Sequence, residues 1–157
     1  EDAMSIRQIV KHSTTSPAGY DVSGYYAPYN TTPLYALLSI SITPKKTGST
    51  MLVFFKARQD SQQHASTLLY RDHTVTTLGA TMDGTLLAES LNGDTSTTFW
   101  NYNNPLLLVF DDTDIVADEE IKYGIAANGG GAGQYSRLYW RDQQDSSQDV
   151  FVVMEIG

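Results

Sequence analysis

The segment Leu34–Arg58 constrains the fold more than any other part of the chain, because it predicts two β-strands and the turn between them. In its first half every second residue is apolar, and this period of two is typical of a strand with one buried face. The residues on that face are Leu34, Ala36, Leu38, Ile40 and Ile42. Pro44–Ser49 is rich in turn-forming residues, and a second strand is expected over Met51–Arg58. We expect this strand pair to form the core of the fold.

The second strand of the pair is apolar on both faces at its start. Met51, Val53 and Phe55 fall on one face, and Leu52 and Phe54 fall on the other. A strand that is apolar on both faces is covered on both sides, by a second layer or by another subunit. This pattern is the first indication of oligomerisation.

The last expected strand, Val150–Ile156, shows the same two-sided pattern. One face carries Val150, Val152, Met154 and Ile156, and the other carries Phe151 and Val153. We expect four residues to pack between subunits. These are Leu52, Phe54, Phe151 and Val153.

Short apolar runs separated by turn residues recur about every ten residues through the rest of the chain, and no segment has a helical apolar stripe of useful length. Ser66–Arg71 and Thr74–Leu78 are expected to form a hairpin around Asp72. In total, roughly ten to twelve strands are expected, enough for two packed sheets. We therefore predict a single domain over residues 1–157 with an all-β, antiparallel, jelly-roll-like sandwich fold. We base nothing on Glu1–Met4, which could be foreign to the natural domain.

Charge and composition argue against several classes of function. The net charge of −8 offers no electrostatic attraction for nucleic acid or for an anionic membrane. No apolar run reaches 18 residues, so no transmembrane helix or membrane insertion is expected, and the chain does not open on a signal-peptide pattern. Cysteine is absent, which removes disulfides, thiolate catalysis and thiolate metal sites.

The motifs that could carry chemistry are weak. The acidic segment Asp111–Glu120 could bind Ca²⁺, but it lacks the glycine and glutamate spacing of an EF-hand, and a solvated turn is the preferred interpretation. The three histidines have no metal-ligand spacing, and no Gly-x-Ser-x-Gly elbow is present. Asp83 and Glu89 could flank a glycosidic bond only at a separation that the sequence does not fix. The glycine-rich Asn128–Gly133 lacks the features of a phosphate loop. We therefore expect no enzyme activity, no cofactor and no metal.

The aromatic residues are the most informative surface signal. Tyr and Trp present flat apolar faces with a polar tip, which suits stacking on sugars and packing in protein hot spots. Core packing is the preferred interpretation for each residue taken singly. For the residues clustered in Tyr20–Tyr29 and beside the glycine-rich segment, surface recognition and core packing are equally good interpretations. The residues predicted to contact a receptor are Tyr25, Tyr26, Tyr29, Trp100, Tyr135, Tyr139 and Trp140.

Four segments, taken in order, resemble the C-terminal domains of bacteriophage tail fibres. The first is Ser39–Lys45 with Gly48–Val53, a strand, a Thr-Pro-Lys turn and a second strand. The others are the Arg-Asp hairpin in Leu69–Thr74, the acidic turn from Phe110 to Tyr123, and the terminal strand Phe151–Gly157. Tyr139–Arg141 and Tyr20–Asn30 depart from this family pattern, and both could be specificity regions.

The resemblance implies a homotrimeric β-sandwich head at the distal end of a fibre, located on the virion, that binds a host cell-surface glycan or an outer-membrane protein for adsorption. Two other interpretations stay open. One is an enzymatic tip domain that degrades host polysaccharide, for which groove-facing carboxylates would be needed. The other is a structural trimerisation or capping module, which would assemble without binding cells.

Overall fold

The computed structural model describes residues 3–12, 25–27, 32–61, 65–92, 101–103, 105–128, 136–139 and 149–157, and within these ranges the protein is all-β. The strands are β1 (Ile6–Lys11), β2 (Tyr25–Ala27), β3 (Leu34–Ile42), β4 (Thr50–Lys56), β5 (Arg58–Ser61), β6 (Ala65–Arg71), β7 (Thr85–Asn92), β8 (Asn101–Asn103), β9 (Leu106–Asp111), β10 (Ile121–Asn128), β11 (Ser136–Tyr139) and β12 (Val150–Ile156).

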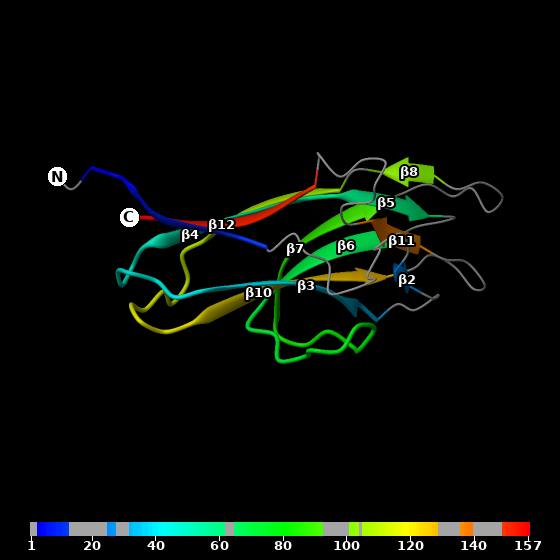
Figure 1. Cartoon of the computed structure of the whole chain (residues 1–157), viewed down its shortest axis with the longest axis horizontal. Helices are drawn as coiled ribbons and strands as arrows, with labels where there is room; N and C mark the ends of the chain where they lie inside the picture. The colour runs from blue at the N-terminus through cyan, green and yellow to red at the C-terminus, as the bar shows by residue number, and fades with distance from the viewer. Residues whose placement is uncertain are drawn as a thin grey trace.

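The strands form three four-stranded antiparallel sheets. Two of them, β1-β12-β4-β9 and β3-β10-β6-β7, make the two layers of the sandwich seen in Figure 1. The third, β2-β11-β5-β8, lies at the end of the molecule away from the two chain termini (Figure 1). Every strand pair is antiparallel, so the predicted all-β antiparallel sandwich is confirmed.

The core lies between the two large sheets and contains the alternating residues of β3 that the sequence indicated. Leu34, Ala36, Leu38, Ile40 and Ile42 are all buried, as predicted. Four of them, from Ala36 onward, share one apolar cluster with Met51, Val53 and Phe55 of β4. The prediction that β3 and β4 pair with each other was wrong. β3 pairs with β10, whereas β4 pairs with β12 and β9, so the 43–49 connection crosses from one sheet to the other.

The predicted hairpin between Ser66–Arg71 and Thr74–Leu78 was also wrong. β6 pairs instead with β7, and residues 72–84 form the connection between them. The backbone N–H groups of Thr74 and Val75 donate to the Asp83 carboxylate, so they are not available to a strand ladder. A local carboxylate has therefore replaced the strand pairing that the apolar pattern suggested.

The 72–84 connection covers the outer face of the β3-β10-β6-β7 sheet, below β3 and β10 in Figure 1. Met82 of this connection packs with Tyr35, Leu68 and Ala126 in a second buried cluster. The sheet is thus buried on both faces around Tyr35, Leu68 and Ala126, whereas Leu86 and Leu91 of β7 stay exposed.

A buried carboxylate fixes the 43–49 connection. Glu155 of β12 is fully buried, and it accepts hydrogen bonds from the backbone N–H groups of Lys45 and Lys46 at 2.9–3.0 Å. The Ser49 hydroxyl and the Gln8 amide also donate to it, at 2.8 and 2.7 Å. The Thr-Pro-Lys turn and the terminal strand, which are far apart in the sequence, are therefore joined by one side chain.

Candidate functional site

The outward side of the β1-β12-β4-β9 sheet is an apolar surface, which we call the outer apolar face. Residues directly opposite each other in antiparallel strands point to the same side of the sheet. The pairs Met154–Leu52, Leu52–Phe110 and Phe54–Leu108 therefore carry this surface across three strands. Its members are Ile6, Ile9, Leu52, Phe54, Leu106, Leu108, Phe110, Val150, Val152, Met154 and Ile156.

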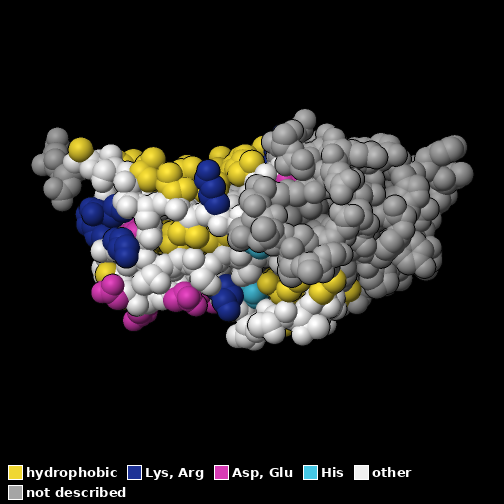
Figure 2. Space-filling view, in the orientation of Figure 1, with side chains coloured by type: hydrophobic (Ala, Val, Ile, Leu, Met, Phe, Trp, Pro, Cys, Tyr) yellow, Lys and Arg dark blue, Asp and Glu magenta, His cyan; other side chains and the backbone are white. Residues whose placement is uncertain are grey.

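Much of the outer apolar face is open to solvent. Leu106 and Leu108 are 53% and 52% exposed, and Phe110 is 65% exposed. In Figure 2 hydrophobic side chains follow one another along the upper edge of the described part, where Figure 1 places β12 and β4. Contiguous apolar surface of this kind on a soluble domain marks an interaction site more often than an isolated exposed leucine does.

The predicted interface residues divide between the two sides of this sheet. Leu52 and Phe54 lie on the outer apolar face, as their prediction requires. Phe151 and Val153 are 2% and 0% exposed and belong to the core, so the role predicted for them at an interface was wrong. The sequence showed that both faces of β12 are apolar, but not which of them faces the other sheet.

Sequence reasoning missed Leu106, Leu108 and Phe110 as members of this surface. The signal was present, because Leu106–Phe110 is wholly apolar and such a strand is covered on both faces. β9 is an edge strand of its sheet, and only its alternate residues, Leu107 and Val109, pack on the core.

A hollow opens at one end of the outer apolar face. It has a volume of about 220 Å³ and is lined by Met4, Gly48, Thr50, Phe110, Ile156 and Gly157. The exposed ring of Phe110 forms one wall. The face therefore offers both a protruding aromatic side chain and an apolar recess beside it.

The outer apolar face carries no carboxylate, although the chain has a net charge of −8. Besides the apolar residues, the outward positions of its four strands hold Lys11, Thr50 and Lys56. Lys56 is paired with Val150 and Leu106, near the strand ends. A long lysine side chain at such a place can keep its ammonium group in water while its methylene groups lie along apolar surface.

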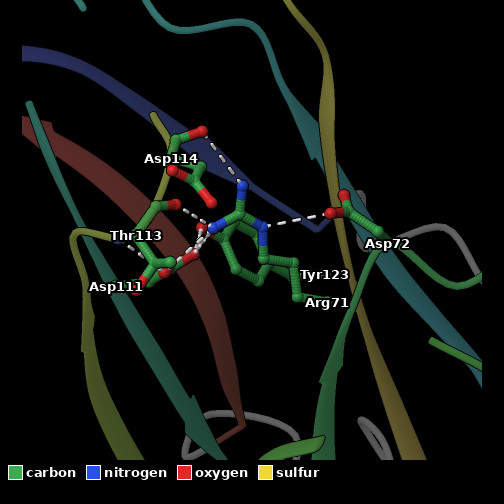
Figure 3. A network of polar contacts seen from close by, with 6 residues as sticks. All are labelled: Arg71, Asp72, Asp111, Thr113, Asp114 and Tyr123. Atoms are coloured by element: carbon green, nitrogen blue, oxygen red, sulfur yellow. Dashed lines mark hydrogen bonds and ion pairs between the residues drawn. The ribbon is translucent and has the colours of Figure 1, made fainter. Parts of the chain in front are cut away.

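A second feature, shown in Figure 3, is the polar network around Arg71 at the end of β6. Its guanidinium donates to both oxygens of Asp111 at 3.0 Å and to the Thr113 carbonyl. Tyr123 donates to the same Asp111 carboxylate at 2.6 Å. Burial, together with this hydrogen bond to Asp111, strongly raises the pKa of Tyr123 and keeps its hydroxyl protonated. The network ties β6 and β10 of one sheet to β9 of the other.

The acidic segment after β9 is largely solvated, as expected, but its first residue is not. Asp111 is buried against Arg71 and Tyr123, whereas Asp112, Asp114 and the acidic residues at 118–120 are exposed. An open pocket of about 430 Å³ beside Arg71 is lined by Asp72, Asp114 and Glu119 among others. No group of three or more His, Asp or Glu within the described ranges is arranged to hold a metal ion.

His73 is a buried residue within the 72–84 connection, and its ring has two polar neighbours. Its Nδ1 lies 3.1 Å from the Val75 carbonyl oxygen, and its Nε2 lies 2.9 Å from the Ser39 hydroxyl. Burial lowers the pKa of His73 below its ordinary value. With the ring neutral, Nδ1–H donates to the Val75 carbonyl and Nε2 accepts from the Ser39 hydroxyl. Both ring nitrogens therefore form contacts within the fold, which indicates a structural role for His73.

Asp83 and Glu89, the carboxylates considered for glycosidic chemistry, are engaged in separate local contacts. Asp83 caps the backbone of Thr74, and Glu89 accepts a hydrogen bond from the Ser66 hydroxyl of β6. No helix in the described part of the chain is long and apolar enough to cross a membrane.

Three of the predicted receptor-contact residues lie on two neighbouring strands of the end sheet. Tyr25 and Tyr26 are in β2, which pairs with β11, and β11 ends at Tyr139. The structure thus brings together segments that are more than a hundred residues apart. The predictions for Tyr29, Trp100, Tyr135 and Trp140 fall outside the described residues.

The comparisons with known proteins give no family. No family model matches the chain, and no curated protein matches it. Among solved structures, an Eiger TNF from S. frugiperda shares 13% identity at a TM-score of 0.44, covering 96% of this chain and 85% of the other. Structures of infectious bursal disease virus, strains Gx and Gt, give 13% and 15% identity with TM-scores of 0.38 and 0.40. They cover 99% of this chain but only 32% and 36% of the viral chains.

Proposed function

We propose that this chain is a non-enzymatic receptor-binding head domain from the distal end of a bacteriophage tail fibre, a jelly-roll-like sandwich that works as a homotrimer. In this role it binds a glycan or an outer-membrane protein on the host cell surface. The receptor contacts proposed are the aromatic residues of the end sheet and of the segments next to it in the sequence.

One observation carries the proposal: the four segments that resemble tail-fibre domains form two contact clusters. The Thr-Pro-Lys turn and the terminal strand meet at Glu155. The Arg-Asp segment and the acidic turn leading to the Tyr strand meet in the Arg71–Asp111–Tyr123 network. Segments that hold each other in place form one structural unit, so their common order supports the resemblance more strongly than each short match does alone.

The direct test is adsorption to cells. Fluorescently labelled protein is incubated with a panel of bacterial strains and with derivatives that lack defined surface glycans or outer-membrane proteins. We expect binding to at least one strain and its loss in one derivative. Tyr25→Ala with Tyr26→Ala should weaken that binding at least tenfold, whereas Val116→Ala, in the exposed loop after β9, should leave it unchanged.

The second candidate is a structural trimerisation or capping module, which the outer apolar face favours because that surface suits assembly without requiring a receptor. A trimer that binds no strain in the panel would favour this candidate. Release of reducing ends from host polysaccharide would instead indicate the enzymatic alternative and overturn the proposal.

A further inference from the structure

The outer apolar face is the largest feature of the described chain that its own fold leaves unused. The two large sheets differ in this respect. The outer side of β3-β10-β6-β7 is covered over β3, β6 and β10 by residues 72–84, with Met82 packed against Tyr35 and Leu68. The outer side of β1-β12-β4-β9 keeps side chains such as Ile9, Leu108 and Phe110 at half exposure or more.

We infer that the outer apolar face is the surface through which copies of this chain assemble. Leu52 and Phe54 of the central strand β4, with Leu108 and Phe110 of the edge strand β9, pack against the same face of two further copies. The number three rests on the proposed function as a fibre head. That the copies contact each other through this face is argued from the structure alone, from the area, the charge and the shape of the face.

The face is large enough to be a substantial part of an interface. Four strands about 4.8 Å apart, each about seven residues long at about 3.4 Å per residue, project onto about 450 Å². This flat projection, to which protruding side chains such as Phe110 add area, is a little over half of the roughly 800 Å² that each partner contributes to a standard interface.

The charge distribution favours another copy over a charged partner. Two chains at −8 each repel one another over most of their surface. The outward positions of β1, β4, β9 and β12 carry no carboxylate, so this repulsion is weakest where the apolar residues lie. Arg7 of β1 is unpaired at the bulge between Ile6 and Gln8, and the charged residues at the paired outward positions are Lys11 and Lys56. Neither has to be buried when the centre of the face is covered.

The shape of the face suits packing on itself. Phe110 protrudes from the edge strand β9, and the walls of the hollow of about 220 Å³ beside it include Thr50 and Ile156. A face with a knob and a recess can pack head to tail around a closed ring, in which each copy inserts into the next.

The oligomeric state of the full chain tests the inference. Light scattering or sedimentation of the wild type should give about 52 kDa, three times the 17.3 kDa chain. Leu108→Glu places a charge on the apolar surface beside Phe54, in the middle of β9, and should give 17.3 kDa. The matched control is Leu86→Glu on β7 of the other sheet, where Leu86 is 47% exposed, and it should stay trimeric. Circular dichroism identifies any variant that fails to fold.

A second measurement avoids any dependence on the folding of a charged variant. Because the chain has no cysteine, Leu108→Cys and Leu86→Cys each introduce one unique thiol. In the assembled protein the thiol at 108 should react with a maleimide at least tenfold more slowly than the thiol at 86.

Any of three results would overturn the inference. The two thiols could react at equal rates, the Leu108→Glu variant could stay folded and trimeric, or the wild type could be monomeric at micromolar concentration. A monomer that binds phosphatidylcholine vesicles would show that the face serves a lipid surface instead. Because these readouts do not involve cells, their failure leaves the adsorption test of the proposed function intact.

Discussion

Replacing Glu155 by Gln tests whether one buried carboxylate holds the turn between the two sheets. Glu155 has no exposed surface, and its nearest polar partners are the backbone N–H groups of Lys45 and Lys46, the Ser49 hydroxyl and the Gln8 amide. Burial by itself would raise the pKa of Glu155, but these hydrogen bonds outweigh it and hold the pKa below its usual range.

The expected magnitude follows from the donors that lose their acceptor. The oxygen of Gln at position 155 can replace Oε1 and still accept from Lys46 and Ser49. Its NH₂ group takes the place of Oε2 and meets the Gln8 donor, so a charge-assisted hydrogen bond is lost and two donors face each other. We expect a cost of about 2–3 kcal/mol in the free energy of unfolding. Glu155→Ala takes this acceptor from all four donors. Gln8 and Ser49 keep the carbonyl oxygens of Thr43 and Lys46, but the backbone N–H groups of Lys45 and Lys46 lose their carboxylate, and the cost should be about 3 kcal/mol or more.

The pH dependence of the free energy of unfolding provides a second test of the role of the Glu155 carboxylate. Because the pKa is lower in the folded state, the contribution of Glu155 is fully present above its unfolded pKa of about 4.3. It is lost as the pH falls through the lower, folded pKa. The difference in stability between wild type and Glu155→Gln should therefore be largest at pH 6–7 and should shrink below about pH 4.

Urea denaturation at fixed protein concentration, at pH 7 and again at about pH 3, measures both quantities. Glu120→Gln is the matched control, because Glu120 is exposed and its replacement should change the free energy of unfolding by less than about 0.5 kcal/mol. A Glu155→Gln variant within that same margin at pH 7, or a difference that does not shrink in acid, would refute this account of the turn.

Three further predictions use the same denaturation assay. Arg71→Met leaves the buried Asp111 carboxylate without its cation and should cost about 3–5 kcal/mol, while a cost below about 1 kcal/mol would mean that the network adds little. Gly124→Ala puts a methyl group 2.5 Å from the His73 ring and 2.9 Å from Met82, so crowding should cost about 1–3 kcal/mol, and an unchanged urea midpoint would contradict it. Burial lowers the pKa of His73 in the folded state, so the unfolded chain takes up the proton at a higher pH than the folded chain does. The free energy of unfolding should therefore fall as the pH drops below about 6.5. His73→Gln should reduce that fall, and a variant with the same pH profile as the wild type would show that His73 does not cause it.

The alternation of apolar residues was enough to predict the fold class and much of the core. In β3 and β4, side chains that share a face in the sequence pattern do share the core in the structure, because a strand can bury one face only by presenting every second residue to it. Turn chemistry also located most strand ends. The predicted strand over Thr74–Leu78 failed because its backbone donors are satisfied by Asp83, a partner nine residues from Thr74 that no periodicity reveals.

The polar clusters that join distant motifs were not predictable either. Glu155 follows two valines and a methionine in a strand, and nothing local indicates that its acceptors will meet the backbone of Lys45. Arg71, Asp111 and Tyr123 come from three strands in two sheets. Sequence reasoning identified the segments that contain them, through a family resemblance, but not the contacts between them.

The sequence by itself determined that β4, β9 and β12 are apolar on both faces, a pattern that predicts a cover on both sides of the sheet. Only the tertiary structure decided which face of each strand packs against the opposite sheet. Strand register turns Phe151 and Val153 inward and leaves Leu52, Phe54 and Phe110 outside, because residues opposite one another across the ladder must point the same way. For a strand with two apolar faces, the alternation of residues does not indicate which face turns toward the core. Contacts between strands far apart in the chain decide it.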